Sequence, residues 1–211
     1  MTIETAKGRD VTILFDAARC IHSRGCVLSH PEVYVPNVQG EWLHPDAAPA
    51  EEVVRSGQMC PSGAIQVLRE GGGSNVVPEV NTLRVRENGQ LAIEAELLVR
   101  GERQPAPRAT LCRCGASANK PFCDGSHTAA GFVATGEPVA RPAEALVMRN
   151  GPVDVVPQKD GPLKVSGNLE LVSGTGRTIN KVVQTFLCRC GQSANKPYCD
   201  GSHKAAGFVA G

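Results

Sequence analysis

The feature that most constrains this chain is a sixteen-residue string that occurs twice. The first copy, CRCGASANKPFCDGSH, runs from Cys112 to His127, and the second, CRCGQSANKPYCDGSH, runs from Cys188 to His203. The copies differ at two positions only, and each sets three cysteines and one histidine in the spacing C-x-C-x8-C-x3-H. Thiolates and imidazoles are ligands for zinc, copper and iron–sulfur sites. So dense a set of these groups indicates a metal-binding protein.

Each copy offers four candidate ligands, which are Cys112, Cys114, Cys123 and His127 in the first and Cys188, Cys190, Cys199 and His203 in the second. Spacing alone leaves a [2Fe–2S] cluster and a structural zinc ion both open. Structural zinc sites mostly pair their cysteines as C-x2–4-C, and the C-x-C pair lies outside that range. The spacing therefore favours an iron–sulfur cluster over zinc.

The string resembles the CDGSH iron–sulfur (mitoNEET-like) family, whose pattern is C-x-C-x2-[ST]-x3-P-x-C-D-G-[SAT]-H. Both copies match it at every defined position, beyond the ligands at Ser117, Pro121, Asp124, Gly125 and Ser126, and at Ser193, Pro197, Asp200, Gly201 and Ser202. The resemblance implies one [2Fe–2S] cluster in each copy. It also implies that Cys112 and Cys114 hold one iron while Cys123 and His127 hold the other. Cys188 with Cys190, and Cys199 with His203, would do the same in the second copy.

A short helix is expected at the histidine. Asp124 and Ser126 are favoured N-cap residues, and Gly125 permits a tight turn before the helix. The helix would run through His127 to about residue 130 and end at Gly131.

The repeat extends upstream of the ligands, because residues 89–99 (GQLAIEAELLV) align with residues 161–171 (GPLKVSGNLEL). The offset is 161 − 89 = 72 there and 188 − 112 = 76 at the first cysteine, so the second copy has four extra residues, which we place within 172–181. Both segments alternate apolar and polar residues, which predicts strands. Residues 143–149 (AEALVMR) are a further strand candidate. One copy is too small to bury a core alone, and the resemblance implies that the two pair within the chain to form a shared β-cap.

The remaining cysteines, Cys20, Cys26 and Cys60, lie in the first third of the chain. A strand is expected at residues 11–15, a helix from Pro49 to Gly57, and another strand at residues 62–68. Cys60 is followed by proline, as the last ligand of a ferredoxin run often is.

This part resembles the divergent single-cluster ferredoxin (4Fe–4S mono-cluster) family at Cys20, His22, Ser23, Cys26, Trp42, Pro45 and residues 60–64 (CPSGA). A ferredoxin would have a further cysteine at position 23, where this chain has serine. Three thiolates suit a [3Fe–4S] cluster, whereas a [4Fe–4S] cluster would need a fourth ligand from His22, Ser23 or solvent. Buried structural cysteines, or a zinc site with one histidine, remain open.

The composition bears on the cellular compartment and on the class of partner. Nine cysteines are an odd number, which argues against a complete disulfide framework. The first ten residues have no apolar core, and no run approaches eighteen apolar residues, so neither a signal peptide nor a membrane span is expected. Clustered thiols suit a reducing cytoplasm. A net charge of +1 without a basic block makes nucleic acid an unexpected partner.

We therefore predict an α+β chain with a small ferredoxin-like module at residues 1–70 and a Gly-rich linker at 71–75. Two CDGSH repeats, at 76–140 and 141–211, would follow as a mainly-β pseudo-dimer, a β-cap with two cluster-binding loops and short helices. The expected function is non-enzymatic electron transfer through two [2Fe–2S] clusters and one [3Fe–4S] or [4Fe–4S] cluster, with an unidentified redox partner or apo-acceptor protein. A cluster donor or redox and pH sensor is one alternative, and a zinc-bearing structural module is another. The sequence has no Rossmann, Walker A or G-x-S-x-G string, so no catalytic residue is assigned.

Overall fold

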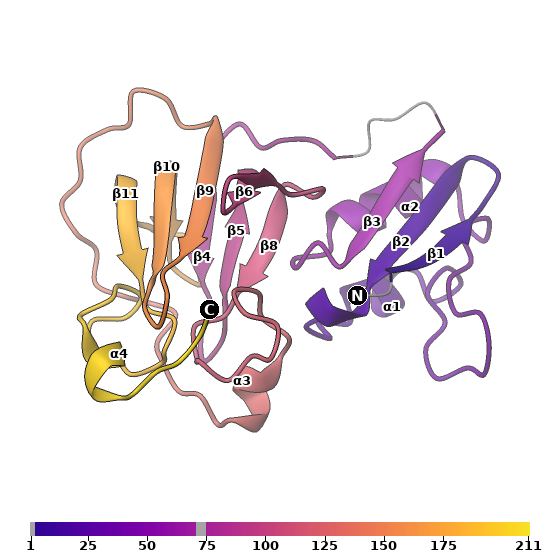
Figure 1. The fold of residues 1–211 in the computed structure, drawn as a ribbon. Coiled ribbons are helices and arrows are strands. Elements are labelled where there is room, and N and C mark those ends of the chain that lie inside the picture. The colour runs from indigo at the N-terminus through magenta and orange to yellow at the C-terminus, as the bar shows by residue number, and fades with distance from the viewer. Residues whose placement is uncertain (1–2, 71–74) are drawn as a thin grey trace. The chain divides into compact units, whose positions relative to one another are not determined.

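Strands and a few short helices alternate along the chain, which is mixed α+β and mostly sheet, as predicted. The computed structural model describes residues 3–70 and 75–211, which fall into two units, Met1–Val76 and Val77–Gly211 (Figure 1). The predicted linker at 71–75 lies outside the described residues except for Asn75. The module boundaries inferred from the sequence stay predictions.

The first unit is a three-stranded antiparallel sheet in the order β1-β2-β3, with a helix packed against it. Its elements are β1 (Ile3–Lys7), β2 (Val11–Asp16), a 3-10 helix (Ala17–Arg19), α1 (Gly25–Ser29), α2 (Ala50–Gln58) and β3 (Ile65–Arg69). The strands expected near residues 11–15 and 62–68 and the helix after Pro49 are therefore confirmed. Val53 and Val54 of α2 share one buried cluster with Ile13 of β2 and Val67 of β3.

The prediction that Gly57 ends this helix was wrong. Gly57 lies inside α2, where a Cβ atom would come within 2.6 Å of Val67 Cγ2. The glycine is present because it lets the helix approach β3 closely, and the helix continues to Gln58. Pro49 is the N-cap of α2 rather than a residue of its first turn.

The second unit contains one eight-stranded sheet in the order β7-β6-β9-β10-β4-β5-β8, with β11 paired to β10. Its elements are β4 (Thr82–Val85), β5 (Leu91–Glu94), β6 (Glu96–Val99), β7 (Glu102–Arg103), β8 (Arg108–Leu111), α3 (Ser126–Ala129), β9 (Pro152–Pro157), β10 (Leu163–Val172), β11 (Thr178–Leu187) and α4 (Ser202–Ala205). The short helices α3 and α4 lie at the same end of the strands (Figure 1).

The two repeats exchange strands within this sheet. β4 pairs with β5 of its own repeat and with β10 of the other, while β9 pairs with β10 and with β6. Leu83 of β4 is opposite Leu171, and Val155 of β9 is opposite Val99. These pairs are related by the repeat offset, since 155 − 83 and 171 − 99 both equal 72. The sheet therefore has an internal pseudo-two-fold relation.

One hydrophobic cluster takes residues from both repeats, from Leu83 of the first to Tyr198 of the second. The four extra residues of the second copy lengthen the hairpin between β10 and β11, where Val172 is opposite Thr178. The shorter hairpin of the first copy joins β6 and β7.

The strand expected at residues 143–149 was wrong, because this segment has no strand pairing. Val147 is fully exposed, so the apolar residues of the segment have no buried face to form. The first strand of the second repeat is instead β9, which begins at Pro152. In the described part of the chain, no helix is long and apolar enough to cross a membrane.

Candidate metal centres

In the first motif, β8 ends at Leu111 and delivers Cys112 to one end of the sheet. Cys112 Sγ lies 3.8 Å from Cys114 Sγ, and Cys123 Sγ lies 3.3 Å from His127 Nδ1. Two sulfur ligands on one tetrahedral metal, with bonds of about 2.3 Å, are about 3.8 Å apart. A sulfur and a nitrogen ligand are about 3.6 Å apart on the same basis. Each pair therefore has the spacing of two ligands on one metal.

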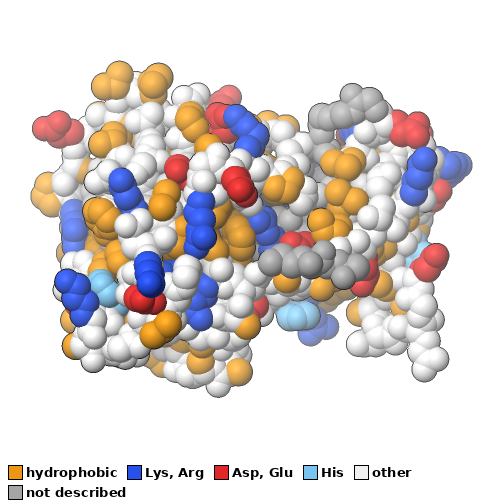
Figure 2. All heavy atoms as spheres, in the orientation of Figure 1, with side chains coloured by type: hydrophobic (Ala, Val, Ile, Leu, Met, Phe, Trp, Pro, Cys, Tyr) orange, Lys and Arg blue, Asp and Glu red, His pale blue; other side chains and the backbone are white. Residues whose placement is uncertain are grey.

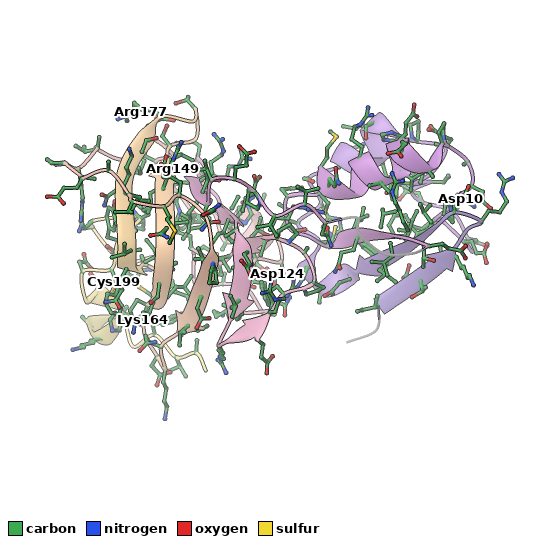
Figure 3. All side chains as sticks on the ribbon, turned by 90° about the horizontal axis from the view of Figure 1, so that it is seen from above. Asp10, Asp124, Arg149, Lys164, Arg177 and Cys199 are labelled. Carbon is green, nitrogen blue, oxygen red and sulfur yellow. The ribbon has the colours of Figure 1, made fainter. Side chains whose placement is uncertain are left out.

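The second motif repeats this geometry after β11. Cys188 Sγ lies 3.8 Å from Cys190 Sγ, and Cys199 Sγ lies 3.4 Å from His203 Nδ1. Figure 3 shows Cys199 and Asp124, which belong to different motifs, in separate parts of this unit. Among the described residues, no three His, Cys, Asp or Glu side chains form a group that could hold a single metal ion. The candidate ligands are thus arranged as pairs.

Backbone amides are directed at the sulfur atoms in both motifs. The N–H groups of Ala116 and Gly125 lie 3.4 Å from the sulfurs of Cys114 and Cys123. Gln192 and Gly201 make the same contacts in the second motif, also at 3.4 Å. Hydrogen bonds of this kind favour the thiolate, which is the form that binds metal.

The thiol pKa values show where a cation is needed. A hydrogen bond from Cys112 lowers the pKa of Cys114 to about 6, while the same pairing raises the pKa of Cys112. Burial raises the pKa of Cys123 to about 11. A buried thiolate at this position needs a neighbouring positive charge, which a bound metal supplies.

The loop that carries the ligands is braced by Ser117 and Asp124. The Ser117 hydroxyl donates to the carbonyl of Phe122 at 2.7 Å, and Asp124 accepts from the amide of Ala118 at 2.8 Å. Partial burial would raise the pKa of Asp124, but hydrogen bonds from Ser126 and Ala118 hold it at about 2. Ser193 and Asp200 make the corresponding bonds in the second loop, at 2.7 and 2.8 Å.

The predicted helix at His127 is confirmed as α3. It starts at Ser126 with Gly125 as its N-cap at φ 89°, where glycine is favoured, so neither predicted cap residue, Asp124 or Ser126, occupies that position. Gly131 follows the helix at φ 59°, as predicted for its stop. His127 is half-buried, and this burial lowers its pKa against the opposing effect of Asp124.

The two Cys-x-Cys turns lie against each other. A Cβ atom on Gly115 would come within 2.8 Å of the Cys190 carbonyl oxygen, and one on Gly191 within 2.5 Å of the Cys114 carbonyl oxygen. This reciprocal contact packs the backbone beside a candidate ligand of each copy against the turn of the other copy. The contact has no signal in the sequence, since only the pairing of the copies brings the turns together.

The arginine between the two cysteines of each turn is a further feature of the site that was not predicted from the sequence. Arg113 and Arg189 are 1 % and 0 % exposed, among the largest fully buried side chains of the described residues. The signal was present, because the first intervening residue of both motifs is arginine.

In the first unit, Cys20, Cys26 and Cys60 line one cavity of about 540 Å³. His22 and Ser23, the alternative fourth ligands, line it too, and His22 Nδ1 lies 4.0 Å from Cys20 Sγ. Burial raises the pKa of both Cys20 and Cys26, and the charge of Cys60 adds to each shift. The structure therefore brings the three predicted cysteines to one space.

The backbone around this cavity is unusual. His22, Arg24 and Asn37 all line the cavity and all have positive φ, at 53°, 62° and 61°. Non-glycine residues seldom adopt this conformation, and such strain is concentrated at ligand sites. Two of these residues, His22 and Arg24, lie in the loop between Cys20 and Cys26, so the strained backbone is next to the candidate ligands.

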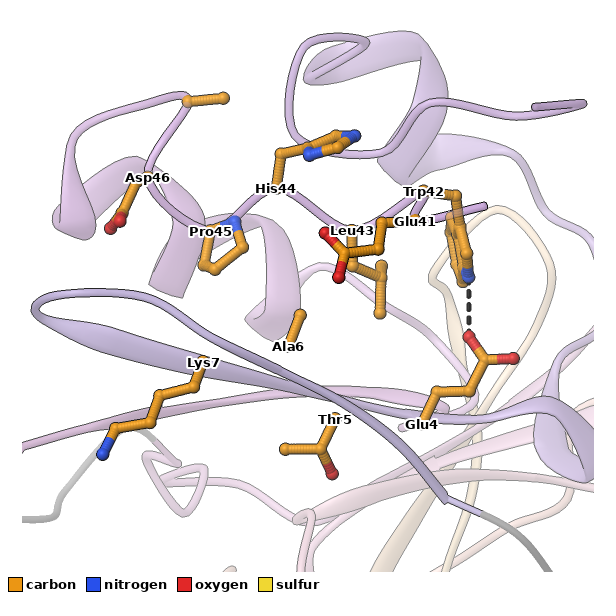
Figure 4. Close-up of a pocket in the computed structure, with 11 residues that line it drawn as sticks. Glu4, Thr5, Ala6, Lys7, Glu41, Trp42, Leu43, His44, Pro45 and Asp46 are labelled. Carbon is orange, nitrogen blue, oxygen red and sulfur yellow. Dashed lines mark hydrogen bonds between the residues drawn. The ribbon is translucent and has the colours of Figure 1, made fainter. Parts of the chain in front are cut away.

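Trp42 packs against the buried cluster of the first unit and also forms a wall of this cavity and of a second one. Its ring packs edge-on against Phe15 at 4.8 Å, and its Nε1–H donates to Glu4 Oε2 at 2.7 Å (Figure 4). The second cavity, of about 360 Å³, lies between β1 and residues 41–47. Trp42 therefore separates the cysteine cavity from this hollow.

Two family models match the chain. Residues 72–128 and 160–204 match the iron-binding zinc finger CDGSH type, and residues 6–70 match the divergent 4Fe–4S mono-cluster. No curated protein showed significant similarity to the chain. The paired cysteine and histidine ligands lie within the two CDGSH matches, and the cysteine-lined cavity lies within the third. The chain is therefore an iron–sulfur protein in which one segment matches the divergent 4Fe–4S mono-cluster model and two segments match the iron-binding CDGSH model.

Proposed function

We propose that the protein is an electron carrier rather than an enzyme, with one [2Fe–2S] cluster in each CDGSH motif and a [3Fe–4S] or [4Fe–4S] cluster in a ferredoxin-like first unit. The observation that carries the proposal is the pairing of the ligands. Each motif offers a Cys–Cys pair at 3.8 Å and a Cys–His pair at 3.3 or 3.4 Å. A binuclear cluster takes two protein ligands on each iron, which is what two such pairs supply.

The histidine ligand supports a direction for the electrons. Two histidines on one iron raise [2Fe–2S] potentials to about −150 to +300 mV, against about −400 mV for all-cysteine plant-type clusters. One histidine places the CDGSH clusters between these limits. An electron entering at an all-thiolate, low-potential cluster in the first unit would therefore move to the CDGSH clusters downhill in free energy.

A second candidate function is donation of clusters to an apo-acceptor, or sensing of redox state and pH. The observation that favours it is the partial exposure of His127 and His203, each at the start of a four-residue helix. Imidazole has a reference pKa near about 6.5, so protons compete with iron for this ligand more readily than for a thiolate.

The proposed setting is a reducing cytoplasm, and the proposed partner is a redox protein or an apo-acceptor. On the face shown in Figure 2, basic and acidic side chains are interspersed with hydrophobic ones. Such a mixed surface suits a protein partner better than nucleic acid, which requires a concentrated basic patch.

Anaerobic purification followed by metal and sulfide analysis tests the proposal. Two [2Fe–2S] clusters require about four irons and an equal amount of acid-labile sulfide. A [3Fe–4S] or [4Fe–4S] cluster adds about three or four irons, respectively, and about four sulfides in either case. A colourless protein with stoichiometric zinc would instead establish the structural zinc alternative. Reduction by a low-potential donor without cluster loss supports electron transfer, whereas delivery of iron and sulfide to an apo-ferredoxin supports the donor function.

A further inference from the structure

We propose that Arg113 and Arg189 are positioning residues that clasp the histidine side of each CDGSH centre and so limit cluster release. The inference rests on the proposed [2Fe–2S] clusters. The segment after each histidine is called here the first strap (residues 128–136) and the second strap (residues 204–211). The turn before each repeat strand is called the first turn (residues 86–89) and the second turn (residues 158–161).

In the first copy, the guanidinium joins the turn to the strap. Arg113 donates to the carbonyls of Arg86 at 3.0 Å and Gly89 at 2.9 Å in the first turn. It also donates to the carbonyls of Ala134 at 2.9 Å and Thr135 at 3.1 Å in the first strap. One side chain, set between two candidate ligands, therefore holds two separate stretches of backbone.

The second copy makes the same clasp. Arg189 donates to the carbonyls of Gln158 at 2.6 Å and Gly161 at 3.0 Å in the second turn. It donates to the carbonyls of Ala210 and Gly211 in the second strap, both at 3.2 Å. Because both copies make the same contacts, these hydrogen bonds belong to the repeated motif and are not peculiar to one copy.

An aromatic ring of the strap completes each clasp. The guanidinium carbon of Arg113 lies 5.2 Å from the centre of the Phe132 ring, and that of Arg189 lies 5.3 Å from the centre of the Phe208 ring. Arginine over an aromatic face is a favourable cation–π contact, stronger where water is excluded. The planar guanidinium both stacks and donates several hydrogen bonds, which lysine cannot reproduce.

Burial makes this arrangement difficult to open, because Arg113 and Arg189 are almost fully excluded from solvent and arginine is charged at neutral pH. A buried cation that loses its acceptors keeps its desolvation penalty, and breaking such a network is far more costly than its net contribution suggests. The clasp should therefore remain closed while the strap is in place.

The clasp acts on the histidine through its neighbours. The Phe132 amide donates to the carbonyl of His127 at 3.0 Å, and a Cβ atom on Gly89 would lie 3.8 Å from His127 Nε2. The strap that Arg113 holds thus begins at the histidine, and the turn that it holds lies against the imidazole. In the second copy, the Phe208 amide donates to the carbonyl of His203 at 3.0 Å.

A second pair of hydrogen bonds also joins each turn to its strap and can be removed without changing the arginine. The side-chain Oδ1 of Asn88 accepts a hydrogen bond from the backbone N–H of Ala134 at 3.0 Å. The backbone N–H of Asn88 donates to the Ala134 carbonyl at 2.9 Å. Asp160 makes the equivalent pair with Ala210, at 2.8 and 2.9 Å. Asn88 is exposed and has φ 47°, so glycine fits this position and removes only the side-chain acceptor.

The test compares Arg113→Lys, Arg189→Lys and Asn88→Gly with the wild-type full-length protein, loaded anaerobically and held at one pH in excess EDTA. The [2Fe–2S] EPR signal of reduced samples gives the rate of cluster loss, and amide hydrogen exchange measures the opening of each strap. Arg113→Lys should speed the loss of half of the signal by about tenfold and raise exchange in residues 128–136 only. Arg189→Lys should do the same to the other half and to residues 204–211.

Asn88→Gly should also speed cluster loss and raise amide exchange, in the first strap alone. If Arg113→Lys does not fold, Asn88→Gly provides the test of the first clasp. Unchanged cluster loss and exchange in Asn88→Gly and in whichever arginine variants fold would overturn the clasp. Equal acceleration of both halves by each single variant would also overturn it, since that is general destabilisation. Wild-type protein without a [2Fe–2S] signal is a different result, because it removes the proposed clusters themselves.

Discussion

The contact between the two Cys-x-Cys turns can be tested by adding a single methyl group. Gly191 has φ 81°, and a Cβ atom there would come within 2.5 Å of the Cys114 carbonyl oxygen and 3.0 Å of its carbonyl carbon. Gly191→Ala therefore has two costs, an alanine at positive φ and a clash with backbone that cannot rotate away. The first costs about 1–2 kcal/mol, and forcing an extra methyl into packed surroundings costs about 1–3 kcal/mol more.

Gly151→Ala is the matched control. Gly151 has φ 89°, but an added Cβ would meet nothing within 4 Å, so this variant has the conformational cost without the clash. We expect Gly191→Ala to lower the unfolding temperature by roughly 10 °C and Gly151→Ala by roughly half as much. Because the displaced carbonyl belongs to Cys114 of the other copy, iron should be lost from both CDGSH motifs in Gly191→Ala.

Differential scanning calorimetry of the anaerobic protein, with iron counted per chain, measures both effects. Equal losses of stability in the two variants would refute the close approach of the turns. Loss of iron from the second motif alone would show that the first motif does not depend on this contact.

Four further predictions concern the candidate ligands and the pairing of the repeats. His127→Cys and His203→Cys should each keep a cluster with a lower reduction potential and greater resistance to acid, because thiolate adds negative charge and removes the titrating imidazole; potentiometric titration and cluster loss on acidification measure this, and unchanged acid lability in the double variant would show that histidine is not the weak ligand. Burial lowers the pKa of His127, and only the neutral imidazole binds iron. The first cluster of the wild-type protein should therefore remain bound at a pH somewhat below the ordinary imidazole pKa and be released on further acidification. Ser23→Cys should convert the cluster of the first unit toward a stable [4Fe–4S] form, seen by EPR as loss of an oxidised-state signal and gain of one after reduction; no iron in residues 1–70 after reconstitution would contradict the cluster. Residues 76–211 should fold as a compact monomer, because β4 and β9 already pair across the repeats within one chain; light scattering that finds an obligate dimer would contradict this.

The ligand sets were accessible from sequence because they are local. Cysteines two residues apart, and a cysteine four residues before a histidine, meet through a turn and one short helix, with no help from distant parts of the chain. The structure accordingly places Cys123 and His127 at 3.3 Å in one continuous loop. The three cysteines of the first unit are spread over forty residues (60 − 20 = 40), yet the match to a known ligand pattern still singled them out.

Two predictions of secondary structure were wrong because contacts with distant residues, which the local sequence does not show, decided the outcome. The segment at 143–149 is apolar enough to predict a strand, but Val147 is fully exposed because no neighbouring strand is available to pair with it. Gly57 is a typical helix stop in sequence, but in the fold it is a packing site for Val67. Strand pairing and helix packing depend on what lies opposite, which periodicity along one segment does not record.

A metal-binding loop could be recognised from the sequence alone, because the identities and close spacing of Cys112, Cys114, Cys123 and His127, which recur in the second copy, are sufficient to define it. How the two loops depend on each other is visible only in the folded protein. Strand exchange through β4 and β9 brings the Cys-x-Cys turns into contact, and folding each strap back onto its turn buries Arg113 and Arg189 in cages of carbonyl groups. The physical reason is one of range: ligand geometry is set within a few bonds along the chain, whereas burial and backbone contact arise between segments that only the complete sheet brings together.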